Sequence, residues 1–130
     1  MTLTALAEMG EDEVLAAAEA CAETIRDAEA ELLRLAYQWA IMHSPDLLDP
    51  AVASQPGREK ARLYGGAGTP EVCEFAAAEL GVRIGRSTYA AAALMADSLD
   101  LYHRHPAVWG RVEAGAVSYT HLTLPTNREV

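Results

Sequence analysis

The sequence EVLAAAEACAETIRDAEAELLRLAYQWAIM, residues 13–42, decides the fold. Its apolar residues recur at alternating spacings of four and three, the pattern of an amphipathic helix or a coiled coil. We call this line of side chains the seam, and it consists of Val14, Ala18, Cys21, Ile25, Ala28, Leu32, Leu35, Trp39 and Met42. The acidic residues 11–13 suit the positive end of a helix dipole, and Pro45 disfavours helix at Ser44. We therefore predict one amphipathic helix of about 48 Å within residues 1–43.

The seam has two interpretations. It either packs on other helices of its own chain or joins two copies as a homodimer through the long helix. Alanine and cysteine make a weak coiled-coil seam, which favours packing within the chain. In that case Leu32, Leu35 and Trp39 are buried, and the part before Ile25 projects from the body.

Residues 44–69 are rich in proline and glycine and are predicted to form a linker loop, with a short helical turn at 58–63. Arg58, Lys60 and Arg62 form a basic cluster there, which is either a solvated loop surface or a contact for nucleic acid. The glycines of this loop do not have the spacing of a phosphate-binding loop, and no Lys-Ser/Thr pair follows them.

Residues 70–116 are predicted to form three shorter helices, which makes the fold all-α. Thr69-Pro70-Glu71 is a helix start, and we expect this helix to end at Gly81. Ser87 is placed to cap the next helix, which His105-Pro106 ends. The last short helix begins at Pro106 and ends near Gly115.

The stretch EFAAAELGVRIGRSTYAAAALM, residues 74–95, has the order helix, turn, capping serine, helix. A DNA-binding helix-turn-helix has this order, and the start of its second helix contacts the major groove. The candidate DNA-binding residues are Arg83, Arg86, Ser87 and Thr88, with Arg58, Lys60 and Arg62 as additional ones.

The alternative is a structural helix corner that binds nothing. The turn VRIGR is longer than the usual three or four residues. The second helix offers few base-reading side chains, and we expect its acidic residues, Asp97 and Asp100, to lie on a solvated face.

Charge and composition restrict the protein class. The net charge is −9, and residues 1–50 contain only two basic residues, Arg26 and Arg34. Such acidity argues against nonspecific nucleic-acid binding by the whole chain, although residues 51–116 carry equal numbers of each sign. The stretch MTLTALAEMGEDE lacks the basic start and apolar run typical of a signal peptide, and no run of roughly 18 apolar residues occurs, so we expect a cytoplasmic protein without a membrane partner. Two cysteines outside any CxxC pair fit a reducing compartment.

Several segments resemble a family of actinobacterial proteins, which carry the domain of unknown function 222 (DUF222) ahead of an HNH endonuclease module. The resemblance covers about residues 30–116, and its marks are LAYQWA, GGAGTPEV, EFAAAELG, GRS, ADSLDL and RVEAG. It implies an N-terminal helical, DNA-engaging region of an HNH endonuclease-like protein. The rival expectation is a helical dimerisation or protein-interaction module without DNA binding.

The HNH chemistry uses histidines and an asparagine that hold a divalent metal. None of the histidines of this chain, His43, His103, His105 and His121, stands in such a context. No catalytic residue and no metal ligand can therefore be assigned. We expect the metal to belong to a nuclease module absent from this chain, and the chain itself to be inactive.

The last residues have a different character. Written as codons, VSYTHLTLPT resembles a transposon-end adapter used in sequencing libraries. We therefore expect residues 117–130 to be an artefactual, disordered tail, and the natural sequence to continue differently after about Ala116.

Overall fold

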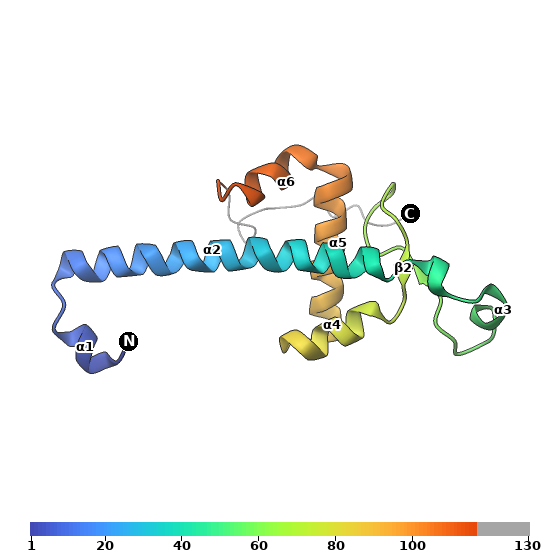
Figure 1. The fold of residues 1–130 in the computed structure, drawn as a ribbon, viewed down its shortest axis with the longest axis horizontal. Helices are drawn as coiled ribbons and strands as arrows, with labels where there is room; N and C mark the ends of the chain where they lie inside the picture. The colour runs from blue at the N-terminus through green and yellow to red at the C-terminus, as the bar shows by residue number, and fades with distance from the viewer. Residues whose placement is uncertain (117–130) are drawn as a thin grey trace.

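The computed structural model describes residues 1–116 (Figure 1). The predicted all-α class is confirmed, and the expectation for residues 117–130 lies outside the described residues. The helices are α1 (Leu3–Ala7), α2 (Glu11–Met42), the 3-10 turn η1 (Pro45–Leu47), α3 (Pro50–Ala53), α4 (Ala76–Ile84), α5 (Thr88–Arg104) and α6 (Pro106–Glu113). One short antiparallel pair, β1 (Ala61–Arg62) and β2 (Val72–Cys73), joins the linker to the start of the second half.

The predicted long helix is present as α2, within residues 1–43, and the separate short helix α1 before it was not predicted. The first half of α2, residues 11–29, is here called the arm; its part before Ile25 projects beyond α4, α5 and α6, and the short α1 lies near its start (Figure 1). No side chain of the arm is buried. The prediction that the part before Ile25 projects is therefore confirmed.

The second half of α2 supplies one side of the core. α5 crosses it, with α4 on one side of α2 and α6 on the other (Figure 1). α2 contributes Ala30, Leu33, Ala36 and Ala40 to the core, and the alanines allow α5 to approach closely. The largest fully buried side chains of α5 are Met95, Leu99, Leu101, Asp100 and Ser98.

The buried face of α2 lies beside the seam rather than on it. Leu35 is 55% exposed and Met42 is 57% exposed, so the predicted burial of Leu35 is wrong. Leu32 and Trp39 are half-buried against the edge of the core. The physical reason is that α5 packs on the alanine-rich face, which lets two helix backbones come closer than the bulkier seam would.

The first helix of the second half begins later and ends later than predicted. Val72 and Cys73 form β2 because they pair with Arg62 and Ala61, so α4 begins only at Ala76. Gly81 lies inside α4, and the helix continues to Ile84. The later helices agree with the prediction, since Ser87 caps α5 and Pro106 opens α6.

The predicted helical turn at 58–63 is wrong. The helical turns of the linker, η1 and α3, come earlier, where Ser44 and Asp49 accept hydrogen bonds from Asp46 N–H and Ala51 N–H. Each of these capping residues precedes a proline at the first helical position, which suits a helix start.

The glycine-rich end of the linker is fixed to α5 by a buried carboxylate. Asp100 is 2% exposed and accepts a hydrogen bond from Gly66 N–H at 2.7 Å. Arg104 forms an ion pair with the same carboxylate at 3.4 Å. The expectation that Asp100 lies on a solvated face is wrong, because the loop covers it.

Candidate nucleic-acid interface

The helix-turn-helix has a shorter turn than the sequence indicated. Because α4 extends to Ile84, the connection to α5 is only residues 85–87. Gly85 ends α4 with φ of 71°, a left-handed conformation that glycine adopts without strain. Three residues with glycine at the first position is the ordinary length and composition of this motif's turn.

Gly81 allows the two helices to come together. A Cβ at this position would lie 2.8 Å from the carbonyl oxygen of Arg86, and Arg86 N–H donates to the carbonyl of Gly81 at 2.9 Å. The small residue required where the two helices meet is thus Gly81. The predicted helix end at Gly81 is wrong. The missing side chain of this glycine indicates instead the close contact between the two helices.

The start of α5 is open to solvent. Ser87 Oγ accepts Ala90 N–H at 3.0 Å and so caps the helix. Thr88 and Tyr89 in the first turn are exposed, and Arg86 in the turn is exposed as well. A first turn with a free surface and a cation beside it fits a phosphate group or a base edge.

Arg62 lies near this helix start. It lines a hollow of about 170 Å³ together with Tyr64, Tyr89 and alanines of α5. The Arg62 guanidinium lies 4.3 Å from the centre of the Tyr64 ring. The short β1–β2 pair therefore places one residue of the predicted basic cluster on the same side as the exposed first turn of α5. No local sequence signal indicated this proximity.

Arg83 lies on the last turn of α4 and is exposed. It lines a hollow of about 380 Å³ with Trp39, Glu79 and Leu80. Trp39 is anchored there by its ring N–H, which donates to the carbonyl of Ala76 at 2.8 Å. Arg83 therefore lies on the part of α4 that adjoins α2.

The other two residues of the basic cluster have different surroundings. Lys60 Nζ donates to the carbonyl oxygens of Ala53, Gln55 and Arg58 at 2.9, 3.1 and 3.2 Å. An ammonium group has only three donors, so Lys60 is fully occupied in holding the loop after α3.

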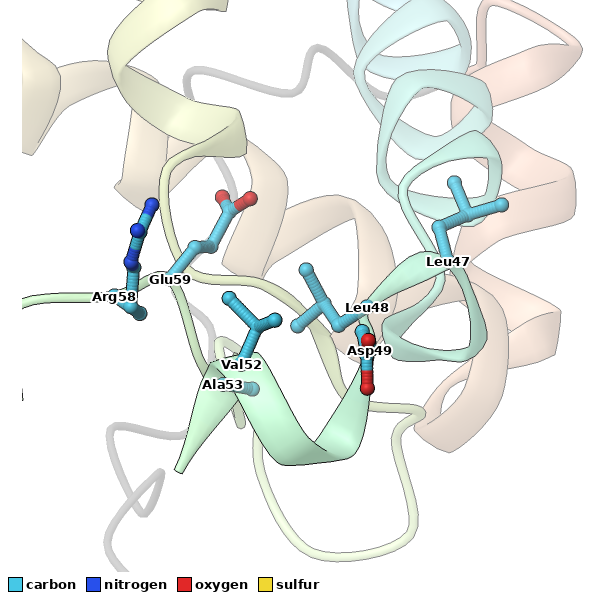
Figure 2. A pocket seen from close by; sticks show the side chains of 7 residues that line it. All are labelled: Leu47, Leu48, Asp49, Val52, Ala53, Arg58 and Glu59. Atoms are coloured by element: carbon cyan, nitrogen blue, oxygen red, sulfur yellow. The ribbon is translucent and has the colours of Figure 1, made fainter. Parts of the chain in front are cut away.

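Arg58 borders a separate hollow of about 240 Å³ in the linker (Figure 2). Leu48 and Val52 extend into this hollow, and Arg58 lies beside Glu59 at its edge. The predicted cluster is thus distributed over three environments, and only Arg62 lies near the start of α5.

An aromatic cluster occupies the opposite end of α5. Tyr37, Tyr102, His103 and Trp109 are in ring contact, and Tyr37 Oη and His103 Nε2 share a hydrogen bond of 3.0 Å. Burial, and secondarily the neighbouring Tyr102, raises the pKa of Tyr37. Within residues 1–116 no group of three or more His, Cys, Asp and Glu side chains is arranged to hold a metal ion.

Comparisons with known proteins give no further assignment. No family model matches the chain, and neither a curated protein nor a solved structure matches it. In the part of the chain that the structure describes, no helix is long and apolar enough to cross a membrane.

Proposed function

We propose that this protein engages duplex DNA through its helix-turn-helix, α4 and α5. The observation that carries the proposal is the three-residue turn, closed by Gly81 and Gly85, which leaves the first turn of α5 exposed beside Arg86. Arg86 and Arg83 supply phosphate contacts, and Thr88 with Tyr89 face the bases. Arg62 extends the same surface.

Charge supports a local interaction rather than a general one. The acidic residues of the first half are concentrated on the arm, which projects away from α4 and α5 (Figure 1). Within roughly 10 Å, the Debye length at 0.1 M salt, α5 therefore experiences mainly the neutral second half of the chain.

The resemblance to the DUF222 and HNH family supplies the biological setting of the proposal. In that setting the helical region positions DNA for a metal-dependent nuclease module elsewhere in the protein. The residues of this chain then contribute binding and orientation, and none of them is assigned a catalytic role.

A second candidate function is a protein-interaction module without DNA binding. The specific observation in its favour is the exposed seam, on which Val14 is 44% and Ile25 is 54% exposed. Duplex binding separates the two functions, because the interaction module predicts none, whereas association through the seam alone does not exclude DNA contact at the start of α5, which is on a different helix.

The first test is duplex binding measured by fluorescence anisotropy at several salt concentrations. Replacing Arg83 and Arg86 together with alanine removes two phosphate contacts. It should weaken binding to all sequences alike and reduce the slope of log affinity against log salt by roughly 2.

The matched control replaces Arg26 and Arg111 with alanine. Both are exposed, and they lie on the arm and on α6. This variant loses the same charge but should keep the wild-type salt slope. If both double variants change the slope equally, or if the Arg83 and Arg86 variant binds normally, the helix-turn-helix is not the DNA contact.

A further inference from the structure

The seam is an exposed apolar surface along the arm and again at Leu35, whereas Leu32 and Trp39 are half-buried against the core of the same chain. Val14, Ile25 and Leu35 are 44%, 54% and 55% exposed, and the smaller members between them, Ala18, Cys21 and Ala28, are also exposed. A continuous stripe of this kind on a helix suits another helix with the same spacing. The chain itself offers that helix in a second copy.

We propose that two copies associate through their seams as an antiparallel pair of α2 helices. This inference does not depend on DNA binding. In an antiparallel pair the seam residues of the two helices meet in reverse order. One such register uses the seam from Val14 to Trp39. In that register Val14 meets the partner's Trp39, Ala18 meets the partner's Leu35, Cys21 meets the partner's Leu32, and Ile25 meets the partner's Ala28.

The sizes of these side chains are complementary. Ala18 lies against a leucine, and Ala28 lies against an isoleucine, so these layers combine a large side chain with a small one. A parallel pair would instead place Ala18 on Ala18 and Ala28 on Ala28. Small side chains would then face small ones and leave space unfilled, while large side chains would face large ones. Facing large and small residues fill the space between helices best.

Charge favours the same orientation. The arm is strongly acidic and Arg26 is its only basic residue, whereas residues 30–42 carry one charge of each sign, Glu31 and Arg34. An antiparallel pair lays each acidic arm along the neutral half of its partner, and a parallel pair lays the two acidic arms together. Antiparallel helix dipoles also attract each other.

The residues beside the seam do not oppose this register. Of the residues directly beside the seam, Glu29 and Glu31 are the charged ones. Glu29 meets the partner's Ala22, and Glu31 meets the partner's Thr24. Like charges therefore do not face each other across the interface, which would destabilise the pair. The other acidic residues of the arm point to solvent.

The contact is small. Residues 14–39 form a strip of roughly 40 Å by 10 Å, about 400 Å² on each copy. Standard stable interfaces cover about 800 Å² per partner, so the dimer is expected to be weak and to dissociate on dilution.

The test uses single cysteines in the full chain after Cys21→Ala and Cys73→Ala. One protein then carries Ala18→Cys and another carries Leu35→Cys, both at exposed positions. After mild oxidation of the mixture, a covalent dimer is expected on a denaturing gel. Neither protein alone should give that dimer, because the two copies of each thiol lie far apart in the antiparallel pair.

Glu23→Cys, off the seam, replaces Ala18→Cys in the matched control mixture and should give no heterodimer. Covalent dimer from either seam protein alone would mean a parallel pair and would overturn the proposed arrangement. A mixture without covalent dimer would overturn the second copy as the occupant of the seam.

Sedimentation of the unmodified chain gives an independent measurement. Ile25→Glu places a charge near the two-fold axis and should abolish concentration-dependent association. Ala16→Glu adds the same charge on an exposed position off the seam and should leave association unchanged. Equal association of the two variants would contradict the proposal.

Discussion

At the scale of single residues, Asp100 connects three parts of the molecule. Its carboxylate accepts the N–H of Gly66, pairs with Arg104 and lies within the core face of α5. Thr69 Oγ donates to the carbonyl of Gly66 at 2.7 Å, which closes the loop over the carboxylate. Asp100→Ala leaves a buried N–H and a half-buried guanidinium without this acceptor, so it should lower the free energy of unfolding by about 3 kcal/mol.

Asp100→Asn is the matched control, because it keeps an acceptor for Gly66 N–H while removing the charge. Chemical denaturation should show a smaller loss for asparagine than for alanine. If both variants were as stable as the wild-type chain, the carboxylate would not hold the loop.

The two cysteines differ in their surroundings. Cys73 is 4% exposed, its thiol donates to the carbonyl of Ser44 at 3.3 Å, and burial, followed by the nearby charge of Glu59, raises its pKa. Cys21 is exposed on the arm. At pH 8 an aromatic disulfide reagent should therefore modify Cys21 quickly and Cys73 slowly, with Cys21→Ala removing the fast phase.

The raised pKa of Cys73 also makes the free energy of unfolding depend on pH. The unfolded chain releases this proton near the ordinary value of 9.0, and the folded chain releases it at a higher pH. The contribution is therefore complete below pH 9 and is lost as the pH rises through the folded pKa. Cys73→Ala should flatten that alkaline loss.

At the scale of elements, α2 has two halves with different roles. The arm buries no side chain, and the core begins with Ala30. Deleting residues 1–28 should therefore change the melting temperature of the dilute protein by only a few degrees. It should also strengthen duplex binding, since it removes the acidic arm. A large loss of stability would show that the arm contributes to the core.

The sequence predicted the existence of α2 because its seam is regular and its ends carry acidic residues and a proline. It did not predict which face is buried. Leu33 and the alanines around it form a second, smaller apolar face, and the choice between the two faces depends on α5. That choice is made by tertiary packing, which a periodic pattern in one helix does not contain.

At the scale of the whole molecule, the sequence predicted the all-α class, the long helix followed by three shorter ones, the cap at Ser87 and the start of the last helix at Pro106. It did not predict α1, η1 or α3. It missed the β1–β2 pair, because two strands of two residues each carry no alternating pattern. The sequence also predicted that Arg58, Lys60 and Arg62 form a single basic cluster. The loop separates Lys60, which is bonded to backbone carbonyls, from Arg62, which lies near the start of α5.

Contact between the start of α5 and DNA can be followed residue by residue in nuclear magnetic resonance spectra of the labelled protein titrated with duplex. The largest amide shifts should fall on Gly85–Ala90, with smaller ones near Arg62, while residues 11–29 should be unaffected. Shifts confined to α2 or to the aromatic cluster, or no shifts at a salt concentration low enough for phosphate contacts, would contradict this contact.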